Sequence, residues 1–405
     1  MFPETLYYIG ISQALFVSLV LFTKANKQGS DFVLMAWLLT ISFKMMILLI
    51  SAEHGEFFDN QFSIGLIPLT FGPFLFLYTK NLLYRRWFFK SRDFLHYTPF
   101  IFFTFLYFTF FKGKLSFDNH MFFLDDGYLW VRLMYSIAFM SSVSYYTFLT
   151  LKILGRHRKQ LKDRFSFLSE SNELNWLYVL TAIFGVTYFL YFSLGTYNVL
   201  MKKGFFDIAY TSDVFLTILA FSVSYFGIKQ PYLFKVIPEE NEEFMALKKK
   251  NESKRKYKNS NLTEEQKEEY VKHIFTFMDE ERPFINAELT VQDLSKQLNI
   301  SRHHLTELLN NDIGKNFFTF INEYRVEEVK RRLLDARFEH LTIVAIAFES
   351  GFNSKSTFNS IFKNHLISSN KLSLTTIKKI VVKTFPIITL PIIKEKKHKS
   401  NSHKN

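Results

Sequence analysis

The sequence predicts an all-α protein in two parts: a bundle of seven membrane-spanning helices, then a soluble domain of short helices. Two observations predict this division. The first 230 residues hold long apolar runs, and beyond them the chain turns to charged segments with regularly spaced apolar positions. Of the 405 residues, 48% are hydrophobic and 21% are charged, so the two classes are segregated along the chain.

Seven apolar runs lie in residues 1–230, each close to the roughly 20 residues that cross a bilayer core of about 30 Å. The alternative is a soluble bundle, whose helices would carry a polar face. The stretch TPFIFFTFLYFTFF (98–111) offers almost no polar side chain, which favours the membrane. The runs are Leu6–Thr23, Phe32–Ser51, Phe62–Leu83, Phe94–Phe111, Tyr128–Leu151, Leu174–Val199 and Ile208–Ile228.

Basic residues between the runs predict the orientation of the chain. Thirteen Lys and Arg lie in or beside the odd-numbered loops, whereas four lie in the even-numbered loops. Because cytoplasmic loops are rich in Lys and Arg, we expect the N-terminus outside and everything after the seventh run inside.

Lys44 lies well inside the second predicted span, and Asp213 lies inside the seventh. Intramembrane ionisable residues are costly and commonly functional, so one interpretation is a Lys44–Asp213 ion pair. The alternative is that the Lys44 side chain reaches outward to the membrane surface.

Composition divides the chain into four predicted segments: a seven-span domain (1–230), a basic linker (231–261), a helical domain (262–365) and an Ile/Lys-rich tail (366–405). The net charge of +13 suggests nucleic acid or an anionic membrane as partner. Yet residues 263–365 carry 13 basic and 17 acidic side chains, a net charge of −4. The basicity belongs mainly to the linker and the tail.

Two pairs of short helices are predicted in the helical domain, each pair joined by a tight turn. Thr290 opens the first pair with a capping-box pattern, Asn299 supplies the turn, and Ser301 caps the next helix. In the second pair, Thr342, Gly351 and Ser354 take these places.

A longer helix is predicted between the pairs, at Asn316–Ala336. Its length of about 30 Å is near the roughly 34–36 Å of one DNA turn, so helices at its two ends would enter successive major grooves.

The segments LTVQDLSKQLNISRHHLTELLNNDIGKNFFTFINEYRVEEVKRRLL (289–334) and LTIVAIAFESGFNSKSTFNSIFK (341–363) resemble the DNA-binding domain of AraC/XylS-type transcription regulators. The whole arrangement resembles a membrane-embedded subgroup in which seven spans precede this domain. The resemblance implies a multi-pass protein of the bacterial inner (cytoplasmic) membrane with a cytoplasmic domain that binds double-stranded DNA. An unknown ligand or protein would supply the signal. Whether the chain forms a homodimer is left open by the sequence.

The resemblance also implies that the second helix of each pair, Ser301–Asn310 or Ser354–Asn364, is a recognition helix. Polar side chains on its open face can bond to phosphates or base edges. Taken singly, each has the alternative interpretation of an ordinary exposed helix residue. The candidate DNA-binding residues are Ser301, Arg302, His303, His304, Thr306, Asn310, Ser354, Lys355, Ser356, Asn359, Ser360 and Lys363.

The sequence departs from the family after Phe362 and Lys363. The family continues with a Gly-x-x-Pro-x-x-Tyr-Arg segment, whereas this chain reads NHLISSNKLS (364–373). We therefore expect a poorly buttressed second pair, with Phe358 and Phe362 partly uncovered.

Catalytic and metal-binding patterns are missing from the sequence. The absence of Cys excludes a disulfide scaffold, a thiolate nucleophile and a Cys-based zinc site. No Gly-rich phosphate loop, HExxH or Gly-x-Ser-x-Gly pattern occurs, so we expect no enzyme, no cofactor and no metal. The competing hypothesis is a receptor- or transporter-like membrane protein whose C-terminal domain has lost DNA binding.

Overall fold

The computed structural model describes residues 2–54, 65–84, 91–111, 129–167, 174–201, 208–233 and 262–368. The chain divides into two compact units, of which the first holds Met1–Arg158 and Glu170–Lys250. The second unit holds Lys159–Ser169 and Asn251–Asn405. The described part of the chain is all-α, as predicted, and its β pairing is one antiparallel bridge. Most of the predicted linker (234–261) and tail (369–405) lie outside the described residues.

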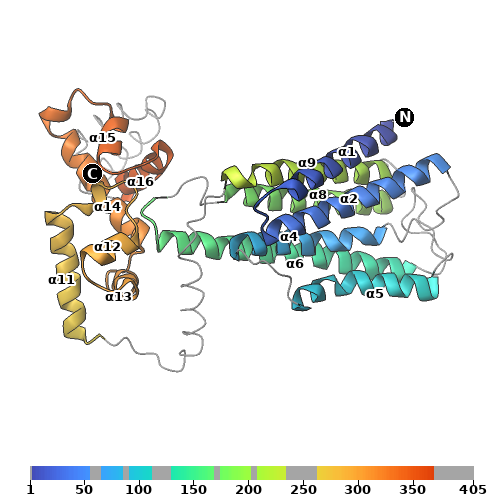
Figure 1. Cartoon of the computed structure of the whole chain (residues 1–405), viewed down its shortest axis with the longest axis horizontal. Helices are drawn as coiled ribbons and strands as arrows, with labels where there is room; N and C mark the ends of the chain where they lie inside the picture. The colour runs from blue at the N-terminus through green and yellow to red at the C-terminus, as the bar shows by residue number, and fades with distance from the viewer. Residues whose placement is uncertain are drawn as a thin grey trace, which may run out of the picture. The chain divides into compact units, whose positions relative to one another are not determined.

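The first unit is a bundle whose long helices lie side by side with roughly parallel axes (Figure 1). Helix α1 packs against α2 and α9, α2 packs against α4, and α8 packs against α9. Trp37, Tyr78 and Phe184 are among its fully buried side chains. The elements are α1 (Phe2–Thr23), α2 (Gly29–His54), η1 (Ile67–Thr70), α4 (Phe71–Tyr84), η2 (Ser91–Tyr97), α5 (Thr98–Leu106), η3 (Tyr107–Phe111), α6 (Leu129–Lys162), α8 (Asn175–Met201) and α9 (Ile208–Leu233).

Among the described residues, five helical stretches are long and apolar enough to cross a membrane. They overlap the first, second, fourth, fifth and sixth predicted runs, whereas the seventh run corresponds to a shorter apolar helix, Asp213–Ile228. The five are Glu4–Thr23, Gly29–Ile50, Ser91–Phe111, Leu133–Lys162 and Asn175–Leu194.

The third predicted run differs from a single long helix. After two α-helical residues, Gly65 and Leu66, the run forms the 3₁₀ turn η1 and then the 14-residue helix α4. Pro68 and Pro73 lack a backbone N–H, so each removes a hydrogen bond from a continuous helix. Nearly every side chain of α4 is buried, which is typical of a helix enclosed by others.

Large apolar side chains also cover the outer surface of the first unit. Phe16, Phe22, Phe105, Ile137 and Phe189 each expose between 62% and 67% of their surface. They lie on α1, α5, α6 and α8. Monomeric soluble proteins rarely expose large apolar patches, so this surface favours contact with lipid.

The two predicted intramembrane charges are both buried in the first unit. Lys44 on α2 and Asp213 on α9 each expose 6% of their surface. Lys44 interacts electrostatically with Asp213, and the Tyr7 hydroxyl donates a hydrogen bond to the Asp213 carboxylate. The burial of both side chains therefore agrees with the predicted Lys44–Asp213 pair. Whether the pair matters for stability or function stays a prediction.

The second unit is built around the central helix α14, which contributes to two hydrophobic cores. Phe317 and Phe320 belong to the core of the first helix pair, whereas Val326 and Val329 belong to that of the second. Besides the end of α6, its helices are α11 (Glu264–Glu280), η4 (Pro283–Ile285), α12 (Val291–Gln297), α13 (Arg302–Glu307), the π-helical turn η5 (Leu308–Asp312), α14 (Phe317–Leu333), η6 (Ala336–Phe338), α15 (Ile343–Glu349) and α16 (Lys355–Ser368).

Two predictions for this unit are wrong. Helix α14 ends at Leu333 rather than Ala336, because the Asp335 side chain caps the next turn by accepting a bond from the Arg337 N–H. Phe358 and Phe362 are completely buried rather than partly uncovered. Helix α16 continues to Ser368, and the two rings pack in the second core.

We predict that Lys44 and Asp213 form one electrostatic unit. Replacing Lys44 by Met or Asp213 by Asn removes one partner of a buried pair and should cost about 3 kcal/mol of stability. The exchange K44D/D213K should restore most of it, because the Tyr7 hydroxyl can donate or accept. The measurement is the thermal midpoint of the full chain in detergent. An exchange variant no more stable than either single variant would contradict the pair.

Candidate nucleic-acid interface

The two helix pairs begin and turn where the sequence predicts. The Thr290 side chain caps α12 in a complete capping box, and Ser301 and Thr342 cap α13 and α15. The Ser354 hydroxyl accepts a hydrogen bond of 3.1 Å from the Thr357 N–H. Asn299 in the first turn has a positive φ of 53°, as its tolerance of the left-handed region allows.

The polar side chains predicted to bind DNA lie on the accessible sides of α13, η5 and α16. None of the twelve is buried, whereas Leu305 and Phe358, on the same helices, are completely buried. The Thr306 hydroxyl donates to the Arg302 carbonyl within the helix, and His303 Nδ1 lies 3.7 Å from Glu307 Oε2, one turn on. The structure thus places the twelve residues on two polar helix faces, and whether they bind DNA stays a prediction.

Helix α14 separates the two pairs by less than the sequence suggests. Its 17 residues span about 25 Å, which is roughly 9 Å short of one DNA turn. The flanking helices or a bend in the DNA must supply the rest if α13 and α16 enter successive grooves.

A buried arginine of α14 holds the backbone that precedes α12 through hydrogen bonds. Arg325 exposes 1% of its surface, and its Nε donates to the Phe284 carbonyl at 2.8 Å. Its Nη2 donates to the Asn286 carbonyl at 2.8 Å and to Ser166 Oγ at 2.9 Å. Its Nη1 donates to the Ser166 carbonyl at 2.9 Å and to Asn322 Oδ1 at 3.3 Å.

These five bonds use the full donor capacity of a guanidinium, and every acceptor is neutral. Burial lowers the pKa of Arg325 to about 9, so the side chain stays charged at neutral pH. A buried charge is tolerated only when hydrogen bonds compensate for the loss of water. For Arg325, carbonyl, amide and hydroxyl oxygens accept those hydrogen bonds.

The turn of the second pair closes against the same arginine. Gly351 has a φ of +96°, and a Cβ there would lie 2.2 Å from the Phe284 carbonyl oxygen and 2.9 Å from Arg325 Nε. Only glycine combines this conformation with so close an approach. Arg325 therefore lies where both helix pairs meet.

An ion-pair network extends along α14 from this point. Glu328 accepts hydrogen bonds from Arg331 and Arg332, and it pairs with Arg282 of the loop before η4. Burial alone would raise the pKa of Glu328, but the hydrogen bonds from Arg331 and Arg332 and the charge of Arg282 lower it to about 2. Arg332 also bonds to Glu349 of α15 at 2.8 Å, so the network joins α14 to the second pair.

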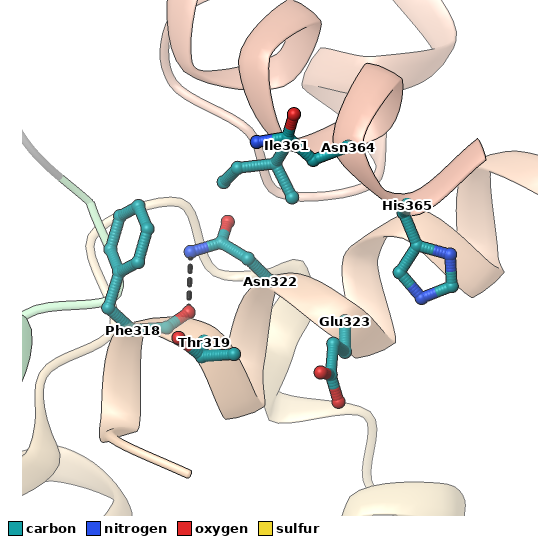
Figure 2. A pocket seen from close by; sticks show the side chains of 7 residues that line it. All are labelled: Phe318, Thr319, Asn322, Glu323, Ile361, Asn364 and His365. Atoms are coloured by element: carbon teal, nitrogen blue, oxygen red, sulfur yellow. Dashed lines mark hydrogen bonds between the residues drawn. The ribbon is translucent and has the colours of Figure 1, made fainter. Parts of the chain in front are cut away.

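A hollow of about 370 Å³ lies between α14 and α16. Figure 2 shows the Asn322 amide directed at the Phe318 carbonyl, a hydrogen bond of 2.7 Å. Among the described residues no group of three His, Asp or Glu is placed to hold a metal ion. The hollow is lined by Phe318, Thr319, Asn322, Glu323, Ile361, Asn364 and His365, none of which is a predicted DNA contact.

In the comparison with known proteins, residues 294–369 match a family model described as "Helix-turn-helix domain". The C-terminal part of the chain is a helix-turn-helix domain. The match covers α13 and both helices of the second pair. Its edge lies inside α12, so the domain extends a few residues further in the structure.

The curated relatives are uncharacterised helix-turn-helix-type transcriptional regulators of Staphylococcus aureus, among them proteins of strains COL, MSSA476 and N315. Each is 32% identical over 79 residues, which is 20% of this chain and 10% of the relative. The chain therefore spans about a tenth of the length of the relatives it matches. No solved structure matches the chain significantly.

Sequence reasoning missed the residues that hold the domain together. Arg325, Asn322 and Glu328 recur every third residue on α14, a polar line beside the apolar stripe that in principle marks a second buried face. Ser166 had no such signal, because it lies in an unremarkable stretch between two apolar runs.

We predict that Gly351→Ala lowers the stability of the second unit by about 3 kcal/mol, through backbone strain and contact with the Phe284 carbonyl. The matched control is Gly314→Ala, because Gly314 also has positive φ (+73°) but open space around its missing Cβ. The control should lose only about 1 kcal/mol. The measurement is resistance of residues 262–368 to protease in the full chain during heating. Equal losses in the two variants would contradict the proposed close approach.

Proposed function

We propose that the chain is a membrane-embedded transcription regulator. The first unit anchors it in a bacterial cytoplasmic membrane, and the helix-turn-helix domain binds promoter DNA sequence-specifically through α13 and α16. The observation that carries this proposal is the family match over residues 294–369, on a chain whose other unit has an apolar outer surface.

Each recognition helix has a side chain suited to reading bases. An Arg such as Arg302 can bond to two acceptors of guanine, and an Asn such as Asn359 can bond to adenine in the same way. His304 and Lys355 would lie beside them in the groove, and Lys363 would bind phosphate. The complete burial of Phe358 and Phe362 supports a folded second pair that is competent to dock.

Seven spans rather than six fit a cytoplasmic DNA-binding domain. With the N-terminus outside, an even number of spans would leave that domain on the side without DNA. The 3₁₀ turn η1 and helix α4 together rise about 29 Å, which is close to the roughly 30 Å hydrocarbon layer. This length supports η1–α4 as the third span, enclosed by its neighbours.

The first unit would sense the signal that controls DNA binding. The buried group of Lys44, Asp213 and Tyr7 supports this role, because ionisable side chains inside a membrane commonly serve function. Its signal would be a ligand or protein reaching the outer side or the bilayer.

We predict two distinct effects on DNA binding by the full chain in lipid nanodiscs, measured on fragments selected from genomic promoters. Arg302→Ala should lower the affinity of the chain for the selected fragments about 10-fold and relax its sequence preference. Lys363→Ala should lower the affinity for all fragments by a similar factor. It should also reduce the magnitude of the slope of log affinity against log salt by about one.

The matched control is Lys272→Ala, an exposed lysine of α11 that is not one of the twelve candidate DNA contacts. It should leave affinity and slope nearly unchanged. Binding that is absent, or that does not respond to salt, would contradict regulation through DNA contact and favour the receptor- or transporter-like alternative.

We predict the topology from single cysteines placed in this Cys-free chain. Lys114→Cys, in an even-numbered loop, should react with a membrane-impermeant maleimide on intact cells. Lys27→Cys, in the first loop, should react only after permeabilisation. The reverse pattern would place the DNA-binding domain outside and exclude the proposed function.

A further inference from the structure

Residues 163–167 belong to the second unit, although first-unit residues flank them on both sides in the sequence. They directly follow α6, a candidate membrane span that ends at Lys162. Part of the connection between two predicted spans, which we expect on the cytoplasmic side, thus belongs to the second unit.

The backbone of this segment pairs with the residues that open α12. Phe165 and Thr290 form an antiparallel bridge. The Ser166 N–H donates to the Leu289 carbonyl at 3.3 Å, and the Val291 N–H donates to the Arg164 carbonyl at 2.9 Å. The two bonds involve Leu289 and Val291, the residues on either side of Thr290, which caps the first helix of the first pair.

Ser166 completes the environment of the buried arginine. Its carbonyl and hydroxyl oxygens accept two of the five hydrogen bonds of Arg325, and the carbonyl also accepts one from the Asn322 amide at 2.8 Å. The Ser166 hydroxyl donates to the Leu289 carbonyl at 2.7 Å. Without this segment, two donors of a buried charge would lose their acceptors, which is costly.

Two further contacts extend the attachment, one toward η5 and the other to α14. Burial raises the pKa of Asp163, whereas Lys159, Arg164 and the Asn310 side chain of η5 each act to lower it, so the Asp163 carboxylate lies near Asn310. The Lys162 ammonium lies 5.8 Å from the centre of the Phe318 ring, a cation–π distance.

We propose that residues 163–167 are a ligand in cis for the DNA-binding unit, held by Arg325, and that their docking keeps this unit in its DNA-binding form. The inference rests on the proposed function. The docked segment holds the start of α12 in place. It also supplies hydrogen-bond acceptors to Arg325 at the point where both helix pairs meet. Because the segment continues directly from α6, a change in α6 would reach the first helix pair through it.

Docking can be tested with one cysteine pair in the full, Cys-free chain. Phe165 and Thr290 are a non-hydrogen-bonded antiparallel pair, whose Cα atoms lie about 4.5 Å apart, within the roughly 4.4–6.8 Å that a disulfide spans. The variant F165C/T290C should therefore oxidise readily in membranes. A specific protease site inserted at residue 250 then separates the two cysteines, so that only the disulfide joins the fragments on a gel. The controls are the two single-cysteine variants.

The effect on DNA binding is measured with Ser166→Ala, alone and combined with F165C/T290C. Ser166→Ala should weaken DNA binding about 5-fold, whereas Ser350→Ala should not. Ser350 is a matched control because it is equally buried and its hydroxyl bonds within its own helix. Oxidation of the combined variant should restore the affinity, and reduction of the same sample should abolish the gain.

Each outcome decides one question. A cross-linking yield no higher than in the single-cysteine variants would overturn docking. Oxidised protein that binds DNA more weakly than reduced protein, or Ser166→Ala without effect, would overturn the link from docking to the DNA-binding form. Failure of the unsubstituted chain to bind any DNA would contradict the proposed function instead. Docking would then still be decided by the cross-linking yield and by whether oxidation raises the thermal midpoint of residues 262–368.

Discussion

The second unit depends on keeping one positive charge out of water. The guanidinium of Arg325 has no carboxylate partner among its hydrogen bonds and is held by oxygens of four residues. Because a buried donor without an acceptor is expensive, each of these bonds fixes the segment that supplies it. The backbone before α12, the segment after α6 and the Gly351 turn all converge there, so the arginine orders both helix pairs at once.

The first unit follows a different constraint. Its long helices carry large apolar residues outward as well as inward, which water would not favour but hydrocarbon does. Its interior charges are few and meet partners, as Asp213 does with Tyr7. Helix α4 is short and enclosed, and Pro68 in the turn before it is the residue at which the third run departs from one continuous α-helix.

Local features of the fold were predictable from the sequence, and long-range ones were not. Thr290, Ser301 and Asn299 act within a few residues of themselves, so caps and turns follow from spacing. The end of α14 was misplaced because the cap formed by Asp335 competes with helix continuation. Phe362 was misjudged because its burial depends on residues of α14 and α15. Ser166 lies 159 residues from Arg325, and no local pattern records such a contact.

The central claim is that two recognition helices of a membrane-held chain read one stretch of DNA. The most direct measurement is a hydroxyl-radical footprint made by the full chain in lipid on a selected promoter fragment. We expect two protected stretches about one helical turn apart on one face of the DNA. Arg302→Ala should weaken protection of one stretch, and Lys355→Ala should weaken protection of the other. A single protected stretch, or protection that both substitutions weaken equally, would contradict the central claim.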